Sequence, residues 1–217
     1  MKQLFSAALV LLAAPMCFAA LLQLEAGPAN IEGVNLAKTA TVMKDGSATN
    51  IDLPLLGAGL RAKKVLVMTV KVYVAQAFGD VQRYVRDDAG SLPSLETMPN
   101  VAMRLTFLRT VDAATVQNSF REALGANQID LNRTDVAAFL RAVSSGGDAT
   151  SGRSMEILFQ REGSKEIVTY EGTDGRAQAV EGQAGFIRSL LSIWYGRPSD
   201  DGVARLKSEL LVRREGY

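Results

Sequence analysis

The fold of this chain is decided by residues 56–78, which read LGAGLRAKKVLVMTVKVYVAQAF. From Val65 to Phe78 the stretch is rich in β-branched residues, and apolar side chains occur at both odd and even positions. We therefore predict a strand that is covered on both faces over part of its length. The segment from Asn50 to Leu56 predicts a short strand that ends at Gly57. The stretch Gly57-Ala58-Gly59 is then interpreted as a turn between two strands.

The same glycines form a G-x-G-x-x-A pattern that resembles a dinucleotide-binding loop. Asp80 follows them at about the 20-residue spacing at which such a loop has its acidic residue. A dinucleotide-binding loop requires a helix directly after the glycines. Because the β-branched run that starts at Val65 is a strand signal, we exclude a dinucleotide site.

Patterns further along the chain predict strands and helices in separate blocks. Residues Val101 to Arg109 alternate, with apolar side chains on one face and Arg104 and Thr106 on the other. Hairpins with helices grouped between and after them predict an α+β fold rather than a βαβ winding. Further strands are expected at Ser154–Gln160, Lys165–Tyr170 and Arg176–Val180, and helices at Asp112–Leu124, Arg133–Val143, Gly185–Tyr195 and from Ser199 or Asp200 through Leu211.

The chain has 217 residues, no histidine and one cysteine. Hydrophobic residues make up 47% and charged residues 22%, which is typical of one globular domain, and we assign residues 20–217 to it. Without histidine, the usual general base and the commonest metal ligand are both absent. Ser-His-Asp sites, Cys-His sites and Cys/His zinc sites are thereby excluded, and we expect no metal and no cofactor.

Residues 1–19 have the pattern of a secretory signal peptide. Lys2 precedes a short apolar run that ends at Pro15, and small residues follow. Cleavage is predicted after Ala19, which makes the chain a periplasmic or secreted protein. The alternative is an uncleaved anchor, because the uncharged run from Gln3 to Leu24 nearly suffices to span a bilayer.

Removal of this segment would change the composition of the chain. Lys2 and Cys17 are lost, so that Lys and Arg together fall from 24 to 23 and equal the 23 Asp and Glu residues. The mature chain is then formally neutral and has no thiol to oxidise or pair. A neutral chain without a basic block is not typical of nucleic-acid-binding proteins, and we expect no nucleic-acid partner.

Arg61 and Tyr73 are the strongest candidates for a binding site. Arg61 carries a permanent charge and a planar fork of donors, and it precedes the most apolar strand. If its side chain points inward, it requires an anionic or carbonyl partner, which the Tyr73 hydroxyl could share. The alternative is a surface arginine and a core tyrosine. The acidic pairs Asp87-Asp88 and Asp200-Asp201 are interpreted as loop and helix-cap residues, and Trp194 as a core residue.

Four segments of the chain are similar, in this order, to segments of the chalcone isomerase-like family, and most of all to its bacterial exported branch. The resemblance extends over roughly Ile31 to Leu211, and its terminal part is the most specific. It implies an open-faced β-sandwich, in which a curved antiparallel sheet packs against a layer of helices. An apolar cleft between the two layers has an arginine at one end. The four segments are Gly57–Arg61, Val72–Ala75, Phe107–Asp112 and Ser192–Pro198.

The resemblance also implies roles for individual residues. Arg61 falls on the arginine that helps to bind the substrate in the plant isomerases, and Tyr73 stands where those enzymes have a catalytic threonine. An arginine with a tyrosine at that position is the pairing of the family's fatty-acid-binding members, in which the two hold a carboxylate. The positions of the remaining active-site residues, a tyrosine, a helix asparagine and a threonine or serine, are taken by Val111 or Asp112, by Asn118, and by Ser192 or Ile193.

Three functions remain open at this point. The first is a non-catalytic periplasmic protein that binds a fatty acid or similar apolar carboxylate, with Arg61, Tyr73, Asn118 and Ser192 as ligand-binding residues. The alternative is a chalcone-flavanone isomerase-type intramolecular lyase, for which Arg61 is the main support. A third interpretation is a structural or partner-binding module with a collapsed cleft, which a salt bridge between Arg61 and its own chain would favour. We rank the binding protein first, because the catalytic threonine and tyrosine positions are not retained.

Overall fold

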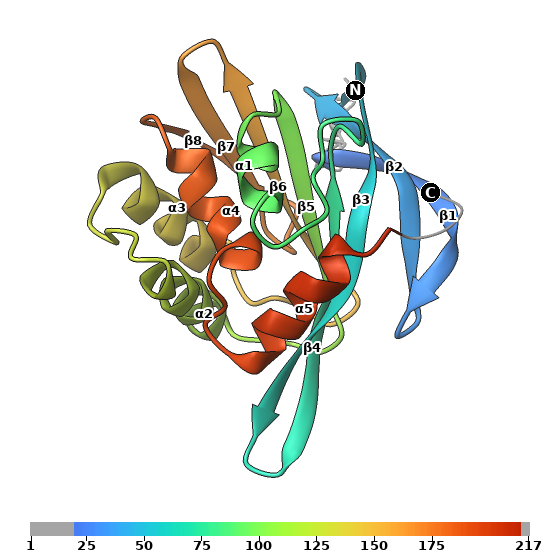
Figure 1. Cartoon of the computed structure of the whole chain (residues 1–217), viewed down its shortest axis with the longest axis vertical. Coiled ribbons are helices and arrows are strands. Elements are labelled where there is room, and N and C mark those ends of the chain that lie inside the picture. The colour runs from blue at the N-terminus through green and yellow to red at the C-terminus, as the bar shows by residue number, and fades with distance from the viewer. Residues whose placement is uncertain (1–19, 214–217) are drawn as a thin grey trace, which may run out of the picture.

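The computed structural model of the chain describes residues 20–213, so the predicted signal peptide lies outside the described residues. Within them, eight strands form one antiparallel sheet in which each strand pairs with the next in chain order (Figure 1). This arrangement confirms the predicted α+β fold, an open antiparallel sheet against a helical layer. The strands are β1 (Leu22–Ile31), β2 (Val34–Lys44), β3 (Ser47–Val65), β4 (Met68–Phe78), β5 (Asn100–Phe107), β6 (Ser154–Glu162), β7 (Lys165–Glu171) and β8 (Ala177–Gly182), and the helices are α1 (Ser91–Glu96), α2 (Ala113–Ala126), α3 (Thr134–Ser145), α4 (Phe186–Tyr195) and α5 (Asp201–Leu211).

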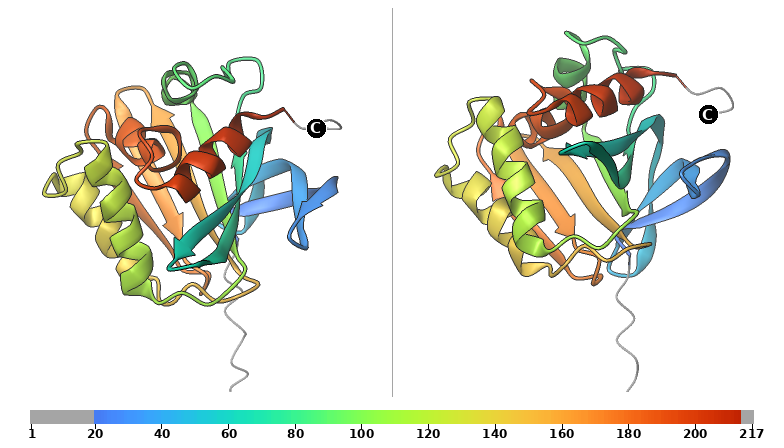
Figure 2. Two further views of the ribbon diagram at one scale, coloured as in Figure 1. Left: turned by 60° about the horizontal axis from the view of Figure 1, so that its bottom comes forward. Right: turned by 90° about the horizontal axis from the view of Figure 1, so that it is seen from below.

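The helices cover one face of the sheet. α3 lies next to β7 and β8, α2 lies beside α3, and α5 lies along β3 (Figures 1 and 2). The alternation of β5 shows why this face is the covered one. Met103 and Phe107 are buried in the main core under the helices, whereas Arg104 and Thr106 face the β1–β2 side. The predicted alternation of this strand is confirmed.

The β1–β2 hairpin folds over part of the opposite face of the sheet. Its apolar side chains form a second cluster with residues of the central strands, among them Phe78, Ala102 and Leu158. Because the helices cover one face of β4 and this hairpin covers the other, β4 is buried on both faces from Tyr73 to Phe78, as predicted.

The interpretation of Gly57-Ala58-Gly59 as a turn is wrong, because β3 continues through these residues to Val65 and the turn lies at Leu66-Val67. Packing rather than a turn requires the glycines. A Cβ on Gly57 would overlap the carbonyl oxygen of Leu210 in α5. Helix α5 therefore approaches β3 until backbone atoms are nearly in contact, which only glycine permits.

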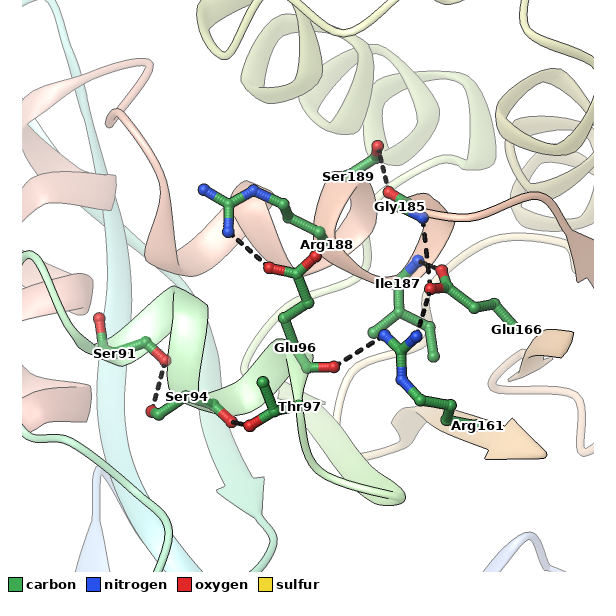
Figure 3. Close-up of polar contacts among 10 residues, drawn as sticks. All are labelled: Ser91, Ser94, Glu96, Thr97, Arg161, Glu166, Gly185, Ile187, Arg188 and Ser189. Atoms are coloured by element: carbon green, nitrogen blue, oxygen red, sulfur yellow. Dashed lines mark hydrogen bonds and ion pairs between the residues drawn. The ribbon is translucent and has the colours of Figure 1, made fainter. Parts of the chain in front are cut away.

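A buried carboxylate fixes the start of α4. Glu166 of β7 is 1% exposed and accepts hydrogen bonds from the N–H groups of Gly185 and Ile187 at 3.2 and 2.8 Å (Figure 3). A carboxylate at this place satisfies amides that have no partner within the helix and interacts favourably with the helix dipole. Arg161 pairs with Glu166 at 2.8 Å and donates to the carbonyl oxygen of Glu96 at 2.8 Å, which ties α1 to the same point.

Local capping signals predicted two other helix starts correctly. Asp112 accepts a hydrogen bond from the Thr115 N–H at 2.8 Å as the N-cap of α2. Asp200 accepts one from the Val203 N–H at 2.9 Å as the N-cap of α5, so its predicted role as a helix cap is confirmed. None of the helices in the described part of the chain is both long and apolar enough to cross a membrane.

A polar cluster is buried between the β1–β2 hairpin and the sheet. Glu156 of β6 is 5% exposed, pairs with Arg104 at 3.1 Å and accepts a hydrogen bond from the Leu22 N–H at 3.0 Å. Burial raises the pKa of Glu156 to about 7; the Arg104 charge opposes this shift and the neighbouring Glu171 charge adds to it. Burial also raises the pKa of Glu171, which accepts a hydrogen bond from the Leu21 N–H at 2.8 Å.

We expect the free energy of unfolding to fall as the pH rises from about 5 to about 8. The pKa of Glu156 is about 7 in the folded chain against an ordinary 4.5, so between these values the folded state keeps a proton that the unfolded state has released. The loss due to Glu156 is on the order of 3 kcal/mol. Glu156→Gln should remove most of it, because the amide oxygen still accepts the Leu22 N–H and carries no charge.

Urea unfolding at the two pH values, followed by the fluorescence of the single tryptophan, measures this dependence. Glu162→Gln changes an exposed glutamate at the end of the same strand and serves as the matched control. It should keep the wild-type pH dependence. A Glu156→Gln variant that loses as much stability with rising pH as the wild-type chain would contradict the assignment to Glu156.

Candidate functional site

A cavity of about 290 Å³ lies between the sheet and the helices α2, α4 and α5. Its inner wall is tightly packed, since Phe107 and Phe120 are only 2% and 3% exposed. The volume lies just below the range of about 300–1,000 Å³ that is typical of small-molecule sites. The cleft is therefore open rather than collapsed. Its apolar wall includes Val72, Phe107, Val116, Phe120, Ile193 and Val203.

Arg61 of β3 and Tyr73 of β4 are directly opposite each other in the sheet, and both line this cavity. Residues paired in this way on antiparallel strands project their side chains to the same face. Each of the two is 8% exposed. The register shifts between Arg61 and Ala62, and irregularities of this kind re-aim side chains next to functional sites. The structure thus brings together the two residues that the sequence singled out, and both point inward.

The Arg61 guanidinium has partners within the chain. Its Nη2 donates to Oδ2 of Asp200 at 2.6 Å, and its Nη1 donates to the carbonyl oxygen of Ala62. Partial burial by itself would raise the pKa of Asp200, but the Val203 N–H and the Arg61 charge outweigh it and hold that pKa below its usual value. Asp200 is therefore an anion that neutralises Arg61. This salt bridge is the feature that the third interpretation predicted, although the cavity beside it is open.

Trp194 orients the Tyr73 hydroxyl. The indole Nε1–H donates to the Tyr73 oxygen at 3.2 Å, and Trp194 is 1% exposed, as expected of a core residue. Burial raises the pKa of Tyr73, and the Arg61 charge and the Trp194 hydrogen bond only partly offset this. The hydroxyl therefore stays protonated at neutral pH, and its own proton remains for a further acceptor.

Apart from Val65, the exposed part of the cavity wall is polar. Lys63 and Arg109 come from the sheet side, and Asp112, Thr115 and Glu122 come from the start and the outer turns of α2. These residues mark the place where the cavity reaches solvent. In residues 20–213 no cluster of acidic or other ligating side chains is arranged to hold a metal ion.

Asn118 and Ser192, which the resemblance marked as ligand-binding residues, do not line the cavity. Asn118 is exposed on α2, because the buried face of this helix is formed by Val116, Phe120, Ala123 and Leu124. Ser192 is 4% exposed within α4, and its hydroxyl donates to the carbonyl oxygen of Ser189 at 2.6 Å. The side chain next to each of them, Ser119 or Ile193, lines the cavity instead.

The position of Ser119 on the cavity wall could have been predicted from the sequence. It directly precedes Phe120, which belongs to the apolar stripe of α2, and a residue beside such a stripe lies at the edge of the buried face. Val111 and Asp112, which occupy the tyrosine position of the plant isomerases, both line the cavity. No pattern in the sequence predicted the ion pair between Asp200 and Arg61, because only the packing of α5 on β3 brings these two residues together.

Comparison with known proteins relates the whole fold to one family. The sequence profile described as chalcone isomerase-like matches residues 28–212. Among solved structures, the crystal structure of a fatty-acid binding protein from Arabidopsis thaliana superposes with a TM-score of 0.55. The two sequences are 18% identical, and the similarity covers 82% of this chain and 92% of the plant chain. No curated protein sequence matches this one. At this identity, the structural similarity shows a common fold.

Proposed function

Because the chain belongs to the chalcone isomerase-like family, we propose that it binds a fatty acid or a similar apolar carboxylate and leaves it chemically unchanged. The observation that carries this proposal is the placement of Arg61 beside Tyr73 on the wall of an apolar cavity. Small-molecule sites are typically apolar with a few polar groups that fix the orientation of the ligand.

In the proposed complex the carboxylate lies against Arg61 and Tyr73, and the acyl chain lies among the valines and phenylalanines of the wall. The guanidinium has five N–H groups, and the contacts with Asp200 and the Ala62 carbonyl leave donors for a second anion. The Tyr73 hydroxyl accepts from Trp194 and can donate its proton to the same carboxylate. Charge-assisted hydrogen bonds of this kind are about twice as strong as neutral ones.

One further fact supports this class of ligand, and another limits the length of its acyl chain. The Arabidopsis protein of similar fold is a fatty-acid binding protein. The cavity of about 290 Å³ is small for a ligand site, which favours a medium-length acyl chain over a long one.

Isomerisation of a chalcone has less support. Tyr73 stands at the position of the catalytic threonine, and a tyrosine can in principle transfer a proton. The raised pKa that burial gives Tyr73 makes its hydroxyl a hydrogen-bond donor rather than a base. Cyclisation of naringenin chalcone faster than both the spontaneous reaction and the reaction with Arg61→Ala would reverse this ranking.

We further propose that the protein acts outside the cytoplasm after removal of residues 1–19. The support is the charged, apolar and small-residue pattern of that segment. Amino-terminal sequencing of protein taken from the periplasm should begin at Ala20. A chain that begins at Met1 and sediments with membranes would favour the uncleaved anchor.

The ligand itself can be tested by binding and by mass spectrometry. We expect one decanoate to bind per chain in titration calorimetry, and native mass spectra of the purified protein to show a bound fatty acid. Decanol has the same chain length without the carboxylate and should bind at least about tenfold more weakly. Equal affinities for acid and alcohol, or no saturable binding from hexanoate to palmitate, would contradict the proposal.

A further inference from the structure

The tip of the β3–β4 hairpin is apolar and exposed. Of the six large hydrophobic side chains that are exposed in residues 20–213, four are consecutive: Val65, Leu66, Val67 and Met68. Leu66 and Val67 are 90% and 93% exposed. The hairpin extends beyond the helices and the rest of the sheet, at the bottom of Figure 1. Contiguous exposed apolar surface of this kind marks an interaction site rather than part of the core.

This turn differs from the other two-residue turns of the sheet. The β1–β2, β2–β3 and β6–β7 hairpins turn at Glu32-Gly33, Asp45-Gly46 and Gly163-Ser164, the glycine and polar residues that such turns favour. Leu66 has a φ of +55°, a conformation in which leucine is disfavoured. An apolar side chain kept there indicates a role beyond turn formation.

An apolar track connects this tip with the cavity. Val65 is paired with Met68, and Val70 is paired with Lys63, so these side chains project to one face of the hairpin. Val65 and Val70 also line the cavity. Arg61 lies further along the same face of β3. A ligand that enters over the tip therefore meets Val65 and Val70, with the charged Lys63 beside them, before it reaches Arg61.

Lysines surround the tip. Lys63 and Lys64 precede it and Lys71 follows it, and residues 63–71 contain no aspartate or glutamate. Lys71 pairs with Glu32 at 2.6 Å, whereas Lys63 and Lys64 form no ion pair within the described chain. Basic side chains around an apolar surface complement anionic lipid headgroups.

We propose that the tip of the β3–β4 hairpin inserts into the headgroup region of an anionic lipid bilayer, and that the cavity takes up or releases its apolar carboxylate there. The exchange step rests on the proposed function, whereas the docking step rests on the tip alone. Leu66 and Val67 leave water on insertion, and Lys63 and Lys64 meet lipid phosphates.

Docking is tested by cosedimentation of the full chain with phosphatidylcholine vesicles, with and without phosphatidylglycerol. The wild-type chain should bind the anionic vesicles preferentially, and added salt should weaken this preference. The variant Leu66→Gly/Val67→Asn removes the apolar tip and places glycine at the position of positive φ, as in the Gly163-Ser164 turn, so it should fold. It should bind anionic vesicles at least about tenfold more weakly. Val212→Asn removes an exposed apolar side chain elsewhere and should bind like the wild-type chain.

Decanoate binding in solution separates docking from ligand recognition. Leu66 and Val67 do not line the cavity, so the double variant should bind decanoate with wild-type affinity but transfer it to anionic vesicles at least about tenfold more slowly.

If the double variant sediments with anionic vesicles as strongly as the wild-type chain, docking is overturned while decanoate binding still supports the proposed function. If vesicles bind the tip but no carboxylate binds the chain, exchange and the proposed function fail and docking is supported. Tip-dependent dimerisation without vesicle binding would assign the tip to a second copy of the chain and overturn the proposal.

Discussion

The Arg61→Met variant is expected to bind decanoate roughly ten- to hundredfold more weakly than the wild-type chain. Methionine keeps an unbranched apolar stem but has no donor, so the carboxylate loses its charge-assisted hydrogen bonds while the cavity keeps its apolar wall. Hydrogen bonds to charged groups contribute about 1.5–3 kcal/mol, which corresponds to this range of affinity. Decanol should bind both proteins equally well. Titration calorimetry of the two ligands against the two proteins gives all four affinities.

Asp200→Asn is the matched control for this substitution. Asparagine is also a good N-cap, so the hydrogen bond from the Val203 N–H and the start of α5 should be retained. The variant removes the anion that now pairs with Arg61 at 2.6 Å, so the guanidinium charge is available to a ligand while Nη1 keeps its bond to the Ala62 carbonyl. Its affinity for decanoate should therefore equal or exceed that of the wild-type chain. If neither variant changes the affinity and both only lower stability, Arg61 is a structural residue and does not hold the carboxylate.

The Gly57→Ala variant is expected to lose about 3 kcal/mol or more of its free energy of unfolding. The new methyl group would overlap the carbonyl oxygen and carbon of Leu210, and backbone atoms cannot move aside as a flexible side chain can. Helix α5 would have to leave β3, which would expose Leu206 and Leu210, both 0% exposed in the wild-type chain. Urea unfolding followed by Trp194 fluorescence measures the loss.

Gly125→Ala is the control for this variant. Gly125 lies in the last turn of α2, and a Cβ there meets no atom within 4 Å. Because alanine is the better helix former, this substitution should leave stability unchanged or raise it by about 0.5 kcal/mol. Wild-type stability of Gly57→Ala would show that α5 does not pack on β3 as closely as described. Since α5 also carries Val203 to the cavity, Gly57→Ala should weaken decanoate binding as well.

Elements whose signals are local could be predicted from the sequence. Asp112 and Asp200 cap helices because a capping side chain bonds to an amide three residues further on. The alternation of β5 predicted which of its side chains face the helices, because successive side chains of a strand point to opposite faces. The resemblance to known proteins predicted the family and the pair formed by Arg61 and Tyr73, but it placed Asn118 and Ser192 in the site, and these do not reach the cavity.

By itself, the sequence determined the class of fold, the helix caps and the inward strand faces, since all of these depend on residues that are close together in the chain. The role of Gly57 and Gly59 was decided by the tertiary structure, because glycine suits a turn and a close backbone approach equally well and only the position of α5 distinguishes them. The position of α5 also set Asp200 against Arg61, and the position of α4 set Trp194 against Tyr73. A buried polar group takes the partner that the fold brings within about 3 Å, and that choice is made between segments far apart in the sequence.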